Sequence, residues 1–132
     1  MTQRFFGDAL DELSKQVIGA AIEVHRHLGP GLLESAYADC LIVELAERGM
    51  ASEKEVLLPL HYKSVVVNKA YRIDLLVEQS LIVELKACDQ LLPVHSAQLL
   101  TYLKLTGLQL GLLMNFNHGL MHQGIKRVVN GF

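Results

Sequence analysis

The chain has 132 residues, of which 51% are hydrophobic and 20% charged, and its formal net charge at pH 7 is −2. This length suits one domain with a hydrophobic core, and the composition excludes a disordered or fibrous protein. The slightly acidic balance also disfavours a protein that binds nucleic acid mainly through its own positive charge.

The sequence shows no sign of export or membrane insertion. No apolar stretch approaches the roughly 18 residues of a membrane helix, and the N-terminus lacks a signal-peptide core. The two cysteines, Cys40 and Cys88, do not have the spacing of a metal site. We therefore expect a cytoplasmic protein without a membrane partner, in which residues 1–132 form a single domain.

Two helices are expected first, at about residues 8–27 and 33–48, separated by the helix-ending pair Gly29-Pro30. Glu34 falls in the first turn of the second helix, where an acid meets unpaired amides and the positive end of the helix dipole. It also lies one turn before Tyr37, on the side of the helix that must turn inward. This position makes Glu34 a candidate site residue as well as an ordinary helix-start acid.

Three strands are expected next, at about residues 55–62, 65–77 and 81–87. The second strand could instead break at Asn68-Lys69, a turn-like pair. Pro59 in the first strand indicates an edge position, because proline cannot donate a hydrogen bond to a neighbouring strand.

The second and third strands carry charged side chains among apolar residues. Asp74 lies in the second, and Glu84 and Lys86 lie in the third, where strand alternation points both to one face. Charges in a covered strand are costly unless something pairs with them. Two carboxylates and a lysine suit a Mg²⁺ or Mn²⁺ ion and an ammonium that holds the attacking water, as in metal-assisted phosphodiester hydrolysis. The alternatives are a buried Glu-Lys or Asp-Lys ion pair, or three charges at fraying strand ends.

Asp74 and Glu84 can share a metal ion only if the two strands pair in a suitable register. A regular two-residue turn would place them on opposite faces of the sheet. A three-residue connection, Glu78-Gln79-Ser80, would pair Val77 with Leu81 and set Asp74 opposite Glu84, with Cβ atoms ~5 Å apart. A β-bulge would have the same effect. We therefore predict an odd connection or a bulge at this point.

A third helix is expected at about residues 94–106, and a last pair of strands at about 108–116 and 120–129. Gln98 and Tyr102 are four residues apart and therefore lie on one face of the helix. Because this helix crosses between two strands, one of its flanks must face the strand ends.

The order α, α, β, β, β, α, β, β, with Ile-Asp in one strand and Glu-Leu-Lys in the next, resembles the PD-(D/E)XK nuclease superfamily. That resemblance implies an α/β fold with a central mixed sheet flanked by helices, the restriction-endonuclease-like core. More closely, Gly31-Leu-Leu-Glu34-Ser-Ala-Tyr37 resembles the motif that names the GxxExxY proteins within this superfamily. The resemblance continues through residues 71–77, 83–87, 92–107, 112–117 and 124–127.

The resemblance implies a role for each matching charged residue. Asp74 and Glu84 would bind Mg²⁺ or Mn²⁺, together with the backbone carbonyl of Leu85. Lys86 would orient or activate water. Glu34 would be an additional acid at the edge of the site or for a second metal ion.

Gln98 and Tyr102 match the Gln-x-x-x-Tyr element that RecB-like nucleases use beside the metal site, and they would position the scissile phosphate or the lysine. The implied function is a divalent-metal-dependent nuclease acting on DNA or RNA. The alternatives are a binding module that keeps the site without turnover, and a structural subunit with a buried charge network. The high hydrophobic content further suggests a homodimer that covers apolar surface.

Overall fold

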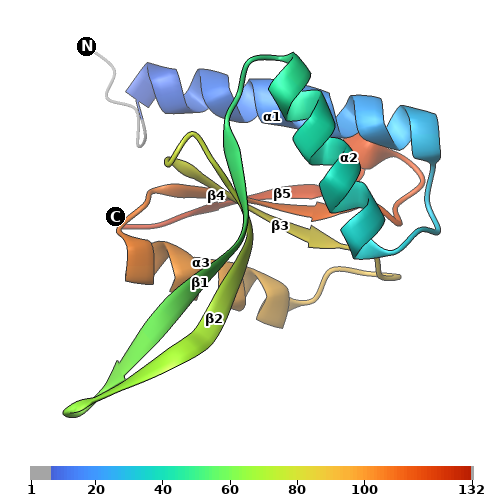
Figure 1. Cartoon of the computed structure of the whole chain (residues 1–132). Coiled ribbons are helices and arrows are strands. Elements are labelled where there is room, and N and C mark those ends of the chain that lie inside the picture. The colour runs from blue at the N-terminus through green and yellow to red at the C-terminus, as the bar shows by residue number, and fades with distance from the viewer. Residues whose placement is uncertain (1–6, 132) are drawn as a thin grey trace.

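The computed structural model describes residues 7–131, with the side chains of residues 69 and 70 excepted. This part of the chain forms a five-stranded sheet with helices on both faces (Figure 1). The helices are α1 (Gly7–Leu28), α2 (Glu34–Glu47), α3 (Pro93–Thr106) and the short 3-10 helix η1 (Met121–Gly124). The strands are β1 (Ser52–Tyr62), β2 (Val65–Val77), β3 (Leu81–Lys86), β4 (Leu110–Asn115) and β5 (Ile125–Val129).

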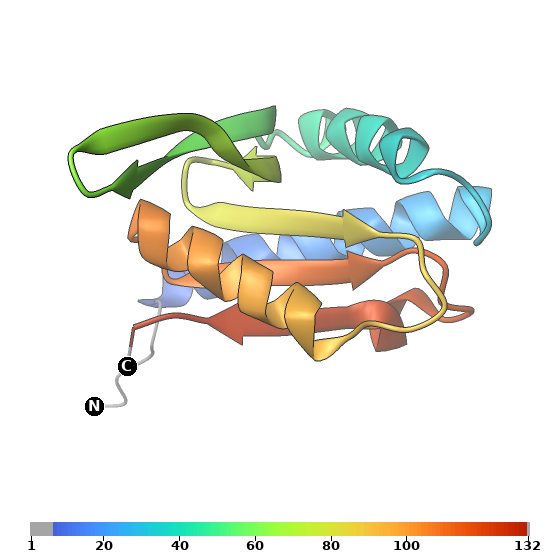
Figure 2. The same cartoon turned by 90° about the horizontal axis from the view of Figure 1, so that it is seen from below.

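The sheet is mixed, with the strands in the order β1-β2-β3-β4-β5. Its neighbours pair antiparallel except β3 and β4, which are parallel and are joined by α3 as the crossover helix. Figure 2 shows α3 on the face of the sheet opposite to α1. The predicted α/β architecture with a mixed sheet flanked by helices is therefore confirmed.

The β1–β2 pair differs from a regular hairpin near its middle. β1 is an edge strand, as Pro59 predicts, and β2 runs without the break considered at Asn68-Lys69. The register shifts between Leu58 and Leu60, so that three residues of β2 lie opposite Pro59 alone. Asn68-Lys69 therefore lie at an irregularity within a continuous strand. Pro59 cannot donate a backbone hydrogen bond to β2 at this point, which permits the shift in register.

The expectation of one strand over residues 120–129 was wrong in its first half. Met121–Gly124 form η1, and only Ile125–Val129 are a strand. Met121 is buried in the core, and Gly124 lies so close to β4 that a Cβ atom on it would be 2.6 Å from the Asn115 carbonyl oxygen. The tight helical turn brings the chain back onto β4, a long-range requirement that the local apolar pattern does not express.

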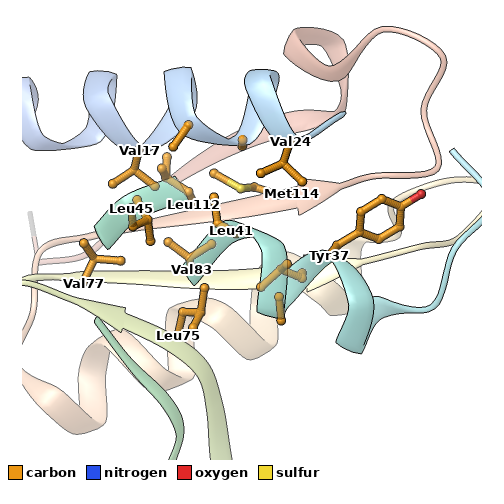
Figure 3. Close-up of a cluster of buried hydrophobic side chains, with 14 of the residues drawn as sticks. Val17, Val24, Tyr37, Leu41, Leu45, Leu75, Val77, Val83, Leu112 and Met114 are labelled. Atoms are coloured by element: carbon orange, nitrogen blue, oxygen red, sulfur yellow. The ribbon is translucent and has the colours of Figure 1, made fainter. Parts of the chain in front are cut away.

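The core has two layers, one on each face of the sheet. On the first face, α1 and α2 pack on β2, β3 and β4, as Figure 3 shows for Val17, Leu41, Leu45, Val83 and Leu112 among others. On the second face, α3 packs through Leu99, Tyr102 and Leu103 on the sheet. Burying each large apolar side chain contributes roughly 1.5–3 kcal/mol. The two layers together fix the positions of β2 and β3, between which the charged residues lie.

Candidate active site

The connection between β2 and β3 has the predicted odd length. Val77 pairs with Leu81, so Glu78, Gln79 and Ser80 form a three-residue loop. Glu78 and Gln79 have left-handed backbone angles of φ 51° and 55°, and the amide of Ser80 donates to the carbonyl of Val77 at 3.0 Å. The predicted odd connection is therefore confirmed, and continuing its register by one residue sets Asp74 opposite Glu84.

The backbone ladder between β2 and β3 ends at Leu75 and Val83, one residue before the two acids. Beyond this point, side-chain carboxylates rather than backbone carbonyls accept hydrogen bonds from the amides of the neighbouring strand. Oε2 of Glu84 accepts a hydrogen bond from the Asp74 amide at 2.7 Å, and Oδ2 of Asp74 accepts one from the Leu85 amide at 2.9 Å. The two strands diverge around a reciprocal pair of carboxylates, each held by the backbone of the other strand.

Burial dominates the electrostatics of the pair. Glu84 is only 3% exposed, and burial, reinforced by the negative charge of Asp74, raises the pKa of Glu84 to about 8. Burial also raises the pKa of Asp74, while the Leu85 amide and the charge of Lys86 act in the opposite direction. The positive charges nearby do not offset the cost of burying these two acids in their ionised form. A bound cation would therefore stabilise the ionised pair.

A pocket of about 100 Å³ opens beside Asp74. This space is large enough for several waters or a partly hydrated ion. Its walls come from α2, β1, β2 and β3 and consist of Glu34, Ser35, Ala38, Lys54, Glu55, Arg72, Asp74 and Leu85. The sequence predictions place Glu34, Asp74 and Leu85 in one site, and all three line this pocket.

Glu34 is positioned by the buried Tyr37. The hydroxyl of Tyr37 donates to the Gly29 carbonyl at 2.6 Å and accepts from the Leu32 amide at 3.1 Å. Its ring stacks on Phe116 with centroids 4.6 Å apart. Tyr37 therefore anchors the turn that leads into α2, at whose first residue Glu34 faces the pocket.

Lys86 is half-buried and follows Glu84 by two residues on the same face of β3. Its charge lowers the pKa of both acids, yet within the described part of the chain it forms no direct ion pair with either. Its ammonium is thus close enough to influence the site and still available to a substrate or a water.

The two candidates on α3 have different surroundings. Tyr102 is 4% exposed, and its pKa is raised by burial and by the nearby charge of Glu84, against a backbone hydrogen bond from Arg72. The ring of Tyr71 meets it edge-on with centroids 5.8 Å apart. Gln98 is exposed one turn earlier, and no contact among the described residues joins it to the carboxylates. The structure brings Tyr102 to the site and leaves Gln98 outside it.

The paired acids suit a hard divalent cation. Oδ1 of Asp74 and Oε1 of Glu84 accept no hydrogen bond from the residues that the structure describes, so neither oxygen is committed to another partner there. No group of three or more His, Cys, Asp or Glu side chains gathers as a complete metal cage in the described ranges. Mg²⁺ is commonly bound by one or two carboxylates and keeps several waters, so Asp74 at the pocket wall, paired with the buried Glu84, suits such an ion.

Three charged residues that line the pocket were missed by the sequence predictions: Lys54, Glu55 and Arg72. Arg72 could have been predicted from the sequence, because it precedes Asp74 by two residues and side chains two apart in a strand point to the same side. Lys54 and Glu55 reach the pocket only through the pairing of β1 with β2, which the sequence does not reveal.

A mixed sheet flanked by helices, with one acid on each of two neighbouring strands and a lysine two residues beyond the second acid, defines a restriction-endonuclease-like domain. A sequence model of the PD-(D/E)XK nuclease superfamily matches residues 11–128, and the chain belongs to that superfamily.

Other comparisons show the fold alone. The crystal structure of the protein SSO0001 is similar with a TM-score of 0.50 and 16% sequence identity, over 91% of this chain and 79% of that one. No curated protein sequence matches. Within residues 7–131, no helix combines the length and apolar character needed to cross a bilayer.

Proposed function

We propose that this domain is a Mg²⁺- or Mn²⁺-dependent nuclease that hydrolyses phosphodiester bonds of DNA or RNA. The observation that carries the proposal is the reciprocal pair of Asp74 and Glu84 at the fork of β2 and β3, with Lys86 beside it. Membership of a nuclease superfamily supports the reaction class.

In this proposal each residue has a defined task. Asp74 and Glu84 would hold the metal ion, assisted by the Leu85 carbonyl and by Glu34, which lines the same pocket as Asp74. An ion held by these residues would supply Lewis-acid chemistry, namely polarisation of the phosphate and a lower pKa for a water. Lys86 orients that water and offsets negative charge on the phosphate.

The two α3 residues have supporting roles in the same proposal. Tyr102 lies close enough to Glu84 for that carboxylate to raise the pKa of the tyrosine, and it would help to position the acid. Gln98, exposed one turn before Tyr102, contacts the substrate outside the pocket.

Within the superfamily, we place the chain in the GxxExxY family. The motif has a physical meaning in this fold that supports the assignment. Gly31 has φ +103°, a left-handed angle that glycine adopts without strain, and Tyr37 binds the turn on either side of it. Together they present Glu34 to the pocket.

We also propose that two copies of the chain associate. The β1–β2 pair extends beyond the rest of the sheet as an arm (Figure 2). The arm exposes large apolar side chains, namely Leu57, Tyr62, Val65, Val66 and Val67. A two-stranded ribbon with uncovered apolar residues is only marginally stable in water, so covering it with a second copy would be favourable.

Cleavage assays on single-stranded, duplex and branched DNA and on RNA test the proposed activity. The wild type should yield products only with Mg²⁺ or Mn²⁺, and Asp74→Asn should yield none. Cleavage that persists in a chelator or in Asp74→Asn would contradict the proposal. A wild type that binds nucleic acid and metal but cleaves nothing would identify a binding module instead.

A further inference from the structure

The outer wall of the pocket carries a small charge cluster that the metal-binding role does not use. Oε2 of Glu55 lies 3.5 Å from Nη1 of Arg72, and Oε1 of Glu55 lies 3.9 Å from Nζ of Lys54. Lys54 is also held by Asp39 of α2 at 2.7 Å. Arg72, Lys54 and Glu55 all line the pocket beside Asp74.

Glu55 is held there by an unusual backbone conformation. It has φ 56°, in the left-handed region, where a glutamate is disfavoured. Its neighbours Lys54 and Val56 pair with Leu75 and Ile73, so Glu55 lies opposite Asp74 itself. The strained residue thus stands directly across β1–β2 from a metal-binding candidate.

The ion pairs of this cluster are exposed and therefore easily exchanged. The side chains of Arg72 and Glu55 are 59% and 51% exposed, and such surface pairs contribute little to stability. Arg72 and Asp74 both line the pocket, so the guanidinium borders the same space as the metal-binding candidate.

We propose that Arg72 and Lys54 form the phosphate-binding wall of the pocket, and that Glu55 is an internal anion which a substrate phosphodiester displaces. The inference rests on the proposed nuclease function and assigns substrate contacts to it. An arginine fork matches two oxygens of a phosphate, and a lysine adds a point charge. The pocket lining carries two basic side chains, Lys54 and Arg72, against the acids Glu34, Glu55 and Asp74, so a phosphate would gain from both bases only when Glu55 releases them.

Binding of fluorescein-labelled DNA oligonucleotides, followed by anisotropy with Ca²⁺ in place of Mg²⁺, tests this inference. Glu55→Gln removes the internal anion and should tighten binding about three- to tenfold, as expected for loss of one competing surface pair. Glu44→Gln is a matched control. It also removes one negative charge and releases an arginine, since Arg48 Nε lies 2.9 Å from Glu44 Oε2, but neither residue lines the pocket. The control should leave the affinity unchanged.

Replacing the proposed phosphate ligand should have the opposite effect. Arg72→Ala should weaken binding and reduce the slope of log affinity against log salt by about 1, the change expected for one lost phosphate contact. Arg72→Gln serves as a second variant that keeps the length of the side chain, and thermal melting verifies that both variants fold.

The possible failures are distinguishable. If Glu55→Gln and Glu44→Gln change the affinity equally, Glu55 is not a displaced anion. If a folded Arg72→Ala or Arg72→Gln keeps the wild-type affinity and salt slope while the wild type cleaves DNA, the phosphate wall is wrong and the nuclease function stands. If the wild type neither binds nor cleaves any nucleic acid, the proposed function fails, and this inference fails with it.

Discussion

The protonation of Glu84 links the site to the stability of the metal-free protein. Its folded pKa of about 8 lies above the ordinary 4.5, so between these values the folded state binds more protons than the unfolded state. The contribution of Glu84 to the free energy of unfolding should therefore be fully present near the lower pH and be lost as the pH rises towards 8. Glu84→Gln should flatten this decline in urea unfolding with a chelator present, whereas Glu44→Gln should not. An equally steep decline in Glu84→Gln would contradict the assignment.

Replacing Lys86 should affect hydrolysis and metal binding differently. Lys86→Ala should reduce any cleavage at least about a hundredfold, in the range of a lost acid–base or water-positioning group. Metal affinity should stay equal or rise, because the positive charge of the lysine opposes a cation. The exposed Lys104 on α3 offers a control, Lys104→Ala, which should cleave like the wild type. Equal loss in both variants would show that the effect is not specific to the site.

At the scale of elements, Tyr37 determines how α2 begins. Tyr37→Phe keeps the ring on Phe116 but removes the hydroxyl that binds Gly29 and Leu32. Losing these two hydrogen bonds should lower the free energy of unfolding by about 1–2 kcal/mol. Urea unfolding measures this change, with the exposed Tyr62→Phe as the control. A stability equal to the wild type would show that the turn does not depend on the hydroxyl.

The elements show what a sequence can predict and where it stops. The helices and the first three strands follow from local periodicity, and the odd β2–β3 connection follows from the requirement that Asp74 and Glu84 share a face. The error at residues 120–124 and the missed Glu55 have another origin. Both depend on contacts between segments distant in sequence, with Gly124 against Asn115 and Glu55 opposite Asp74. Tyr37 was visible in a motif, but its hydroxyl contacts required coordinates.

At the scale of the whole molecule, the exposed arm predicts self-association. Sedimentation at tens of micromolar protein, within the range of ordinary homodimer affinities, should show a dimer. Val66→Asp places a charge on the arm, where the valine is 48% exposed, and should shift the population to monomer without unfolding the chain. A wild type that sediments only as monomer at these concentrations would remove the dimer proposal.

The central claim is that Asp74 and Glu84 form one divalent metal site, and calorimetric titration with Mg²⁺ or Mn²⁺ tests it most directly. The wild type should bind metal at this site, and Asp74→Asn should lose at least about tenfold in affinity. Removing only a residue that hydrogen-bonds to a metal ligand already costs about that much, so removing a ligand should cost no less. Glu44→Gln should bind like the wild type. Equal metal binding by the wild type and Asp74→Asn, or binding by neither, would contradict the account.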